Sequence, residues 1–252
     1  MAKCTITGES INNKIVKFKA LSQEQTWPTL VVFCKRPKLH QGKQRLAEVI
    51  EPQRVLVVAE ALLACAIEDT KAWQGQVVIA CADENDMQWA QTLNEHAQVI
   101  AQLPSGLSGN LGQRLNYVDQ TLRTLGHKQL VFIGTDAPAL NHEHYLAVVN
   151  ALNTHDIVLS HADDGGVVIM ANNQSWPNIV DLPWSSEHLS QALAKKCLSQ
   201  NLSVDYTLPS YDIDYVKDIE KLIIDLRDDP RPARQALLGI IQSLFMPIEL
   251  SM

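Results

Sequence analysis

The chain has 252 residues, and its 28 acidic residues outnumber 21 basic ones, which gives a formal net charge of −7. A chain of this length can bury a core without disulfides or structural metals, so we expect a single domain. The acidic balance disfavours a nucleic acid or an anionic membrane surface as partner, although a bound cation or a few basic groups still permit a small phosphorylated ligand.

The two ends of the chain are expected to be additions to one domain that spans 1–252. Residues 1–28 are polar and mixed, which indicates an N-terminal extension, and 225–252 are expected to form a helical C-terminal tail. No segment has the apolar stretch of a signal peptide or the roughly 18 apolar residues of a membrane span. The five cysteines include no C-x-x-C pair, which indicates reduced thiols. We therefore expect a cytoplasmic protein.

Four continuous apolar runs follow, and strands that are buried on both faces of a sheet have this pattern. The runs lie at 30–35, 76–82, 129–134 and 156–161, with helical spacing at 52–71, 86–96, 111–125 and 141–152. Further elements are expected at 166–170 (strand), 187–200 (helix), 202–207 (strand) and 214–244 (helix). Alternating strands and helices predict a three-layer α/β/α, Rossmann-like fold around a mostly parallel, mixed sheet.

The residues that directly follow the strands are the candidates for chemistry, because ligands collect beyond the carboxyl ends of parallel strands. A basic loop follows the first strand, and carboxylates follow several others. A metal diphosphate requires this combination, because carboxylates hold Mg²⁺ or Mn²⁺ while basic side chains hold phosphates. The basic loop contains Lys35, Lys43 and Arg45, and the acidic positions are Asp136, Asp163, Asp164, Asp212 and Asp214.

Each of these features also has a purely structural interpretation. The basic run is typical of a solvated loop, and Asp136 stands where a turn residue before Pro138 is expected. Asp212 and Asp214 share one face if their segment is extended, but Asp214 also occupies the position of a helix N-cap. The residues alone leave both interpretations open.

Asn110 lies in a G-x-x-G-x-x-G stretch that differs from the dinucleotide fingerprint. We interpret it as the N-cap of a helix that begins near Leu111, and such a helix terminus can also accept a phosphate or a substrate hydroxyl. Because the glycine fingerprint is missing after the first strand, a dinucleotide-dependent oxidoreductase is only a remote alternative.

Six motifs together resemble a bacterial family of glycosyltransferases associated with radical-SAM and selenodomain proteins or arsenosugar biosynthesis, which has the glycosyltransferase-A fold. The similarity spans roughly residues 30–222. In chain order the motifs read FCKRP with KQRL, GNLGQR, IGTDAPAL, DDGG, PWS and YDID.

The resemblance implies that Lys43 and Arg45 face nucleotide phosphates, while Asp136, Asp212 and Asp214 surround a Mg²⁺ or Mn²⁺ ion. It implies transfer of a sugar from a nucleotide-diphospho-sugar to a small-molecule acceptor, and it leaves a homodimer open. The remaining motif residues are assigned to substrate binding (Lys35, Asn110, Arg114, Gly165, Gly166, Trp184 and Ser185) and to catalysis on an acceptor hydroxyl (Asp164 and Asp163).

Four positions depart from the family pattern and leave the substrate and catalytic competence open. His40 replaces a glycine, Gln44 a threonine, Asn110 an aspartate and Val167 an aromatic residue. One alternative is therefore nucleotidyl transfer from a nucleoside triphosphate with release of pyrophosphate, as in guanylyltransferases of this fold. The other is a nucleotide-binding homologue without catalysis. We expect neither a nucleic acid nor a membrane as partner.

Overall fold

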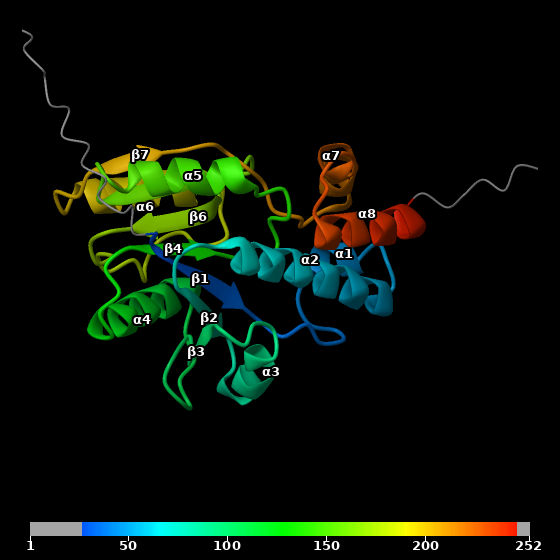
Figure 1. Cartoon of the computed structure of the whole chain (residues 1–252), viewed down its shortest axis with the longest axis horizontal. Helices are drawn as coiled ribbons and strands as arrows, with labels where there is room; N and C mark the ends of the chain where they lie inside the picture. Colours follow the sequence, from blue (N-terminus) through cyan, green and yellow to red (C-terminus); the bar gives the residue numbers. More distant parts are fainter. Residues whose placement is uncertain (1–26, 246–252) are drawn as a thin grey trace, which may run out of the picture.

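The computed structural model describes residues 27–245, in which seven strands form one sheet in the order β3-β2-β1-β4-β6-β5-β7 (Figure 1). Strand β6 runs antiparallel to its neighbours β4 and β5, whereas the other pairs are parallel. The predicted mostly parallel, mixed sheet is thus confirmed. The strands are β1 Thr29–Cys34, β2 Val77–Cys81, β3 Gln98–Ala101, β4 Leu130–Ile133, β5 Ile157–His161, β6 Val167–Asn172 and β7 Val204–Tyr206.

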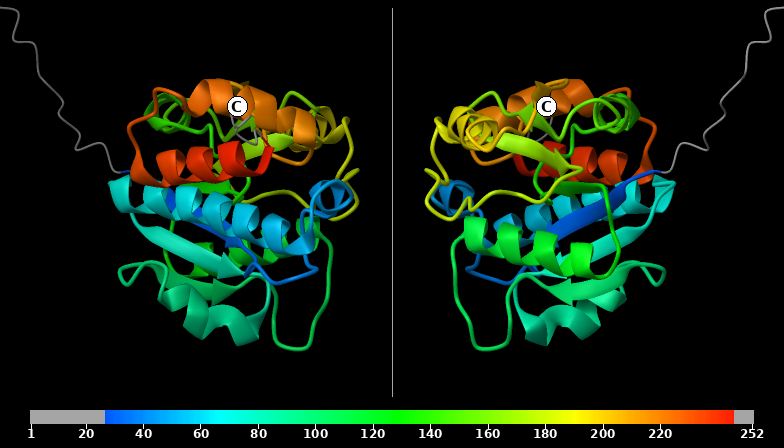
Figure 2. Two further views of the ribbon diagram at one scale, coloured as in Figure 1. Left: turned by 90° about the vertical axis from the view of Figure 1, so that its right-hand side faces the viewer. Right: turned by 90° about the vertical axis from the view of Figure 1, so that its left-hand side faces the viewer.

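Helices cover both faces of this sheet, which confirms the predicted three layers. Side chains of α2, α3 and α5 pack on one face, and those of α4 and α6 pack on the other (Figures 1 and 2). The helices are α1 Gln44–Ala47, α2 Pro52–Ala72, α3 Met87–Gln91, α4 Leu111–Thr124, α5 His142–Ala151, α6 Leu189–Leu198, α7 Val216–Leu226 and α8 Pro232–Phe245, with a 3-10 turn, η1, at Glu84–Asp86.

Strand β1 shows why a continuous apolar run predicts burial on two sides. Leu30 and Val32 belong to the core beneath α2, whereas Val31 belongs to the core beneath α4. All three side chains are fully buried. Successive side chains of a strand point to opposite faces, so a strand covered by helices on both sides must be apolar throughout.

The C-terminal helix α8 lies against α2, and α7 packs on α8, so neither lies on the sheet (Figure 2). Tyr211 and Ile213, in the extended segment before α7, belong to the same apolar cluster and are buried. Because side chains alternate along an extended segment, the intervening Asp212 and the following Asp214 are directed away from that cluster.

Several elements differ from the sequence-based expectations, and the short helix α1 and the turn η1 were not predicted. The edge strand β3 was not predicted, because it has four residues, begins at the exposed Gln98 and is otherwise half-buried. Helix α3 is shorter than the expected 86–96. The helix expected over 214–244 is divided into α7 and α8, and α8 begins at Pro232, whose ring suits the first turn of a helix.

The cysteines that the structure describes are free thiols in the core. Burial raises the pKa of Cys34 to about 12 and that of Cys81 to about 11, so both remain protonated near neutral pH. Cys4, the expected extension as far as residue 26, and the tail beyond residue 245 lie outside the described residues. Within 27–245 no helix has the length and apolar character needed to cross a membrane.

Candidate active site

A cavity of about 1360 Å³ opens at the carboxyl ends of β1, β2, β3 and β4. Because β6 is antiparallel, it contributes its first residues, Val167 and Val168, to the same wall. The sheet topology therefore brings together most of the residues predicted to form the site. Those that line the cavity are Lys35, Arg45, Arg114, Asp136, Asp164, Gly166, Trp184, Ser185, Asp212 and Asp214.

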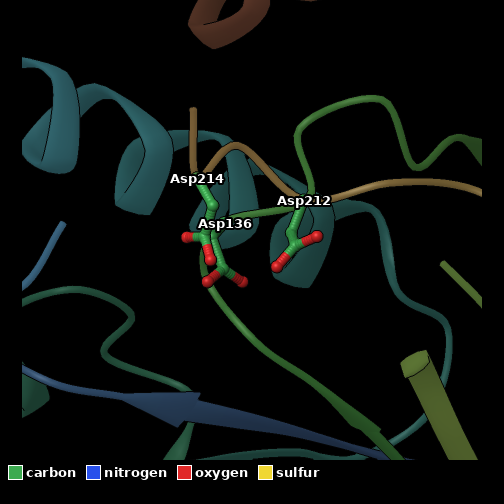
Figure 3. Close-up of side chains that lie close together, drawn as sticks. All are labelled: Asp136, Asp212 and Asp214. Atoms are coloured by element: carbon green, nitrogen blue, oxygen red, sulfur yellow. The ribbon is translucent and has the colours of Figure 1, made fainter. Parts of the chain in front are cut away.

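Asp136, Asp212 and Asp214 converge on one wall of this cavity. Asp136 lies in the loop after β4, and the other two lie in the segment before α7. One carboxylate oxygen from each lies within 4.8 Å of the others, and the three side chains point toward one another (Figure 3). The backbone N–H of Ile213 donates to the carbonyl of Asp136 at 2.9 Å, which fixes the two segments side by side.

Two basic side chains from the first loop reach these carboxylates. The Lys43 ammonium donates to Asp136 Oδ2 at 3.1 Å and to Asp214 Oδ1 at 3.0 Å, and Arg45 donates to Asp214 Oδ2 at 2.9 Å. Burial lowers the pKa of Lys43, but the charges of Asp136 and Asp214 outweigh it, so the pKa is raised above its usual value. The basic loop is therefore not simply a solvated surface loop, because Lys43 and Arg45 form ion pairs with the acidic cluster.

The N-cap interpretation of Asp214 is wrong. The N-cap of α7 is Tyr215, and the Asp218 carboxylate accepts the backbone N–H groups of Asp214 and Tyr215 at 2.9 and 2.7 Å. The Asp214 carboxylate pairs instead with Lys43 and Arg45.

Asp212 is the member of the cluster that lacks a cationic partner among the described residues. Burial, together with the charges of Asp136, Asp214 and Asp164, raises its pKa to about 6. A half-buried carboxylate with no counterion, beside two further carboxylates, suits a divalent cation, which binds hard oxygen ligands and offsets their repulsion. The residues present therefore fit Mg²⁺ or Mn²⁺.

Asp164 lines the cavity from the turn between β5 and β6, and in the sheet β4 lies between these two strands and β1, which precedes the basic loop. Its Oδ1 accepts the backbone N–H of Gly166 at 2.9 Å. Gly165 allows this turn, because its φ is +87° and a Cβ there would lie 2.0 Å from the Glu187 carbonyl oxygen. One carboxylate is thus presented to the cavity close to, but apart from, the three aspartates.

Four predicted site residues do not line the cavity. Lys43 bridges Asp136 and Asp214 and is largely buried, and Gly165 packs against 187–190. Asp163 pairs with Lys221 instead. Asn110 caps α4 as predicted, accepting from Gln113 N–H at 3.0 Å, and its amide nitrogen donates to the Val180 carbonyl at 2.9 Å.

Sequence reasoning missed several cavity residues. Asp86 follows β2 and holds Lys38 at 2.9 Å and Arg36 at 3.5 Å, and Gln102 follows the unpredicted strand β3. Tyr215 follows directly after the YDID motif, and the Arg45 guanidinium lies over its ring at 4.7 Å. Each of these residues could have been found from its position shortly after a strand or a motif, because such positions meet at one edge of the sheet.

Comparisons with known proteins agree with this fold. Residues 64–186 match the family model DUF2064, described as an uncharacterized protein conserved in bacteria. A provisionally assigned nucleotide-diphospho-sugar transferase from Desulfovibrio desulfuricans G20 has a similar structure, with a TM-score of 0.76 and 21% identity over 87% of this chain and 98% of that one. A cytidylyltransferase from Leptospira borgpetersenii serovar Hardjo-bovis (strain JB197) is similar at a TM-score of 0.51 and 15% identity, over 90% and 98%. No curated protein matches the sequence.

Proposed function

We propose that this protein is a metal-dependent glycosyltransferase that moves a sugar from a nucleotide-diphospho-sugar to the hydroxyl group of a small-molecule acceptor. One observation carries the proposal: Asp136, Asp212 and Asp214, from two separate segments, meet within 4.8 Å at a cavity that Lys35 and Arg45 also line. The fold shared with a provisionally assigned nucleotide-diphospho-sugar transferase supports it. Membership of the radical-SAM-associated family stays a prediction.

In this proposal Asp136, Asp212 and Asp214 hold Mg²⁺ or Mn²⁺, which when bound neutralises charge on the departing nucleoside diphosphate. Lys35 and Arg45 contact the phosphates from the basic side, because both line the cavity and Lys35 has no ion-pair partner among residues 27–245. Fixed positive charges aimed at a leaving group lower the barrier as its negative charge develops.

Asp164 is the proposed partner of the acceptor hydroxyl. It lines the same cavity from the turn between β5 and β6, which β4 separates from the loop after β1, so an acceptor held there approaches the sugar from another side than the phosphates. A carboxylate at hydrogen-bond distance can orient that hydroxyl and accept its proton. Asp163, which pairs with Lys221, remains a predicted catalytic residue, but the geometry favours Asp164 for this role.

Nucleotidyl transfer is the second candidate, because the same cation site would activate the α-phosphate of a nucleoside triphosphate. The fold similarity to a cytidylyltransferase motivates it. The two reactions release different products: sugar transfer from a nucleotide-diphospho-sugar releases a nucleoside diphosphate, whereas nucleotidyl transfer from a nucleoside triphosphate releases pyrophosphate.

The test combines ligand discovery with product analysis. A thermal-shift panel of nucleotide sugars, nucleoside triphosphates and diphosphates, each with and without Mn²⁺, identifies the ligand. A ligand at 100 times its dissociation constant adds about 2.7 kcal/mol to the stability of the folded state. Release of a nucleoside phosphate from a nucleotide sugar supports our proposal, and pyrophosphate from a triphosphate supports the second candidate.

Asp136→Ala separates both enzymatic candidates from a nucleotide-binding homologue without catalysis. We expect this substitution to abolish metal-dependent turnover, because it removes one of three carboxylates. Unchanged ligand binding and unchanged product formation in Asp136→Ala would leave the catalytic proposal without support.

A further inference from the structure

Two basic side chains partly neutralise the three aspartates, and this observation extends the proposed function, on which the inference below rests. Asp136, Asp212 and Asp214 bring three negative charges to one point, and Lys43 and Arg45 bring two positive ones. The cluster is left with a single formal negative charge. A cation site that is neutralised to this extent attracts a divalent ion far less than three free carboxylates would.

Lys43 contributes more to this neutralisation than Arg45 does. Its ammonium bridges two carboxylates at 3.1 and 3.0 Å, and its side chain is only 13% exposed. Arg45 contacts Asp214 alone, and its side chain is 47% exposed, so water and salt screen its charge. The counter-charge that a divalent ion meets is therefore mainly that of Lys43.

The loop that carries Lys43 has an unusual backbone conformation. Lys43 itself has a φ of 44° and His40 a φ of 62°, both in the left-handed region that non-glycine residues rarely adopt, while Gly42 has a φ of 75°. Residues held in this region cost free energy and cluster at functional sites. Lys43 is not among the residues that line the cavity, although its ammonium pairs with Asp136 and Asp214, which are.

Lys35 occupies the opposite situation. It lines the cavity, it is exposed, and no carboxylate among the described residues pairs with it. A diphosphate entering the cavity can thus meet Lys35 without breaking an existing ion pair. In this arrangement Lys35 is available to a phosphate, whereas Lys43 neutralises the carboxylates.

We propose that Lys43 is the built-in counterion of the cation site, and that it makes the divalent ion and the diphosphate of the nucleotide bind as a coupled pair. The ion alone meets a nearly neutralised cluster and binds weakly. With a diphosphate in the cavity, the ion also contacts phosphate oxygens, so its affinity rises, and by linkage the ion raises the affinity for the diphosphate equally.

The test measures Mn²⁺ binding at pH 8, by the paramagnetic resonance signal of free Mn²⁺, for wild type, Lys43→Met and Lys43→Arg. The matched control is Lys217→Met, which removes a cavity lysine that pairs with no described carboxylate and lies over the Tyr215 ring. We expect Lys43→Met to bind Mn²⁺ about tenfold tighter than wild type, within the usual range of coupling effects. Lys43→Arg and Lys217→Met should bind like wild type.

A second readout measures coupling itself through thermal stability with Mn²⁺, with inorganic pyrophosphate, and with both. In wild type, both together should stabilise more than the sum of each alone, and this excess should shrink in Lys43→Met. Adding Asp136→Asn to Lys43→Met should remove the tighter Mn²⁺ binding, which assigns it to this site.

The outcomes separate this inference from the proposed function. If Lys43→Met binds Mn²⁺ no tighter than wild type or Lys217→Met, the counterion role is overturned while the cation site stands. If wild type and every variant fail to bind Mn²⁺, with or without pyrophosphate, the proposed metal-dependent function is overturned together with the inference.

Discussion

Asp212 holds a charge that the metal-free protein does not stabilise. Burial and the nearby carboxylates of Asp136, Asp214 and Asp164 raise its pKa to about 6, and no basic side chain in 27–245 pairs with it. Ionisation of Asp212 therefore lowers the stability of the folded state. Ionisable groups with such perturbed pKa values are common at functional sites, where a ligand can offset the cost.

Asp212→Asn is expected to stabilise the metal-free protein at pH 7.5. The folded state of wild type binds the Asp212 proton more tightly than the unfolded state, so stability falls as pH rises from about 4 to about 6. Above that window wild type keeps the full cost of the ionised carboxylate, which asparagine does not have. Chemical denaturation of both proteins in chelator, at pH 5 and 7.5, measures the difference.

The advantage of Asp212→Asn should be larger at pH 7.5 than at pH 5. Saturating Mn²⁺ should reduce or reverse it, because the ion stabilises wild type at the carboxylate that asparagine lacks. Equal stability of the two proteins at both pH values, without metal, would show that the carboxylate is not destabilised as described.

Gly165 is required by the turn that presents Asp164. Gly165→Ala should cost about 1–2 kcal/mol for the left-handed backbone alone, and more because its Cβ would meet the Glu187 carbonyl oxygen at 2.0 Å. Gly239→Ala is the matched control: it lies within α8, nothing is within 4 Å of its added Cβ, and a gain of about 0.5–1 kcal/mol is expected. Urea denaturation measures both, and a stable Gly165→Ala would contradict the close approach.

At the scale of single residues, the sequence predicted those side chains whose position follows from the end of a strand. Asp136 and Asp164 line the cavity because they directly follow β4 and β5. Neighbours in a turn point in different directions, so sequence position could not separate Asp164 from Asp163. Nor could it show that Lys43 bridges two carboxylates, because that contact joins segments more than 90 residues apart.

Helix α8 fixes the loop that carries Asp136. The guanidinium of Arg234 is fully buried and donates to the carbonyls of Pro138 and Leu140, just after Asp136, and to the carboxylates of Glu68 and Asp69 in α2. An element distant in sequence thereby sets the position of Asp136, a ligand of the proposed cation site. Nothing in the local sequence around Arg234 distinguishes it from a surface arginine of a helix.

Arg234→Met is expected to destabilise the protein by about 3–5 kcal/mol, because it removes the buried cation that pairs with Glu68 and Asp69 and the donor to the Pro138 carbonyl. Arg227→Met, at an exposed position, should stay within about 0.5 kcal/mol of wild type. Denaturant unfolding of both variants measures the contrast. Similar stabilities would mean that Arg234 is not the clamp that its hydrogen bonds indicate.

At the scale of elements, predictability followed burial. The four long apolar runs were predicted within one or two residues, because a strand covered on both faces has a strong pattern. Strand β3 was not predicted, because a half-buried edge strand has almost no hydrophobic sequence pattern. The break between α7 and α8 was signalled by Pro230 and Pro232, but periodicity continues on both sides of it.

For the molecule as a whole, topology creates the site. Parallel strands β1, β2, β3 and β4 end at one edge, and antiparallel β6 begins there, so basic and acidic loops meet although they are far apart in sequence. The net charge of −7 is compatible with an anionic ligand because Lys35 and Arg45 line this cavity, and Lys35 has no carboxylate partner among the described residues. The alternation of strands and helices in the sequence predicts that these loops meet at one edge of the sheet. It does not predict the distances between their side chains.

The most direct test of the central claim is a crystal structure with Mn²⁺ and the nucleotide identified in the ligand panel, with the ion located by its anomalous scattering. Our account predicts one strong anomalous peak bonded to carboxylate oxygens of Asp136, Asp212 and Asp214 and to a phosphate oxygen of the nucleotide. A peak at another position, or a nucleotide bound in the cavity with these three carboxylates contacting no ion, would contradict it.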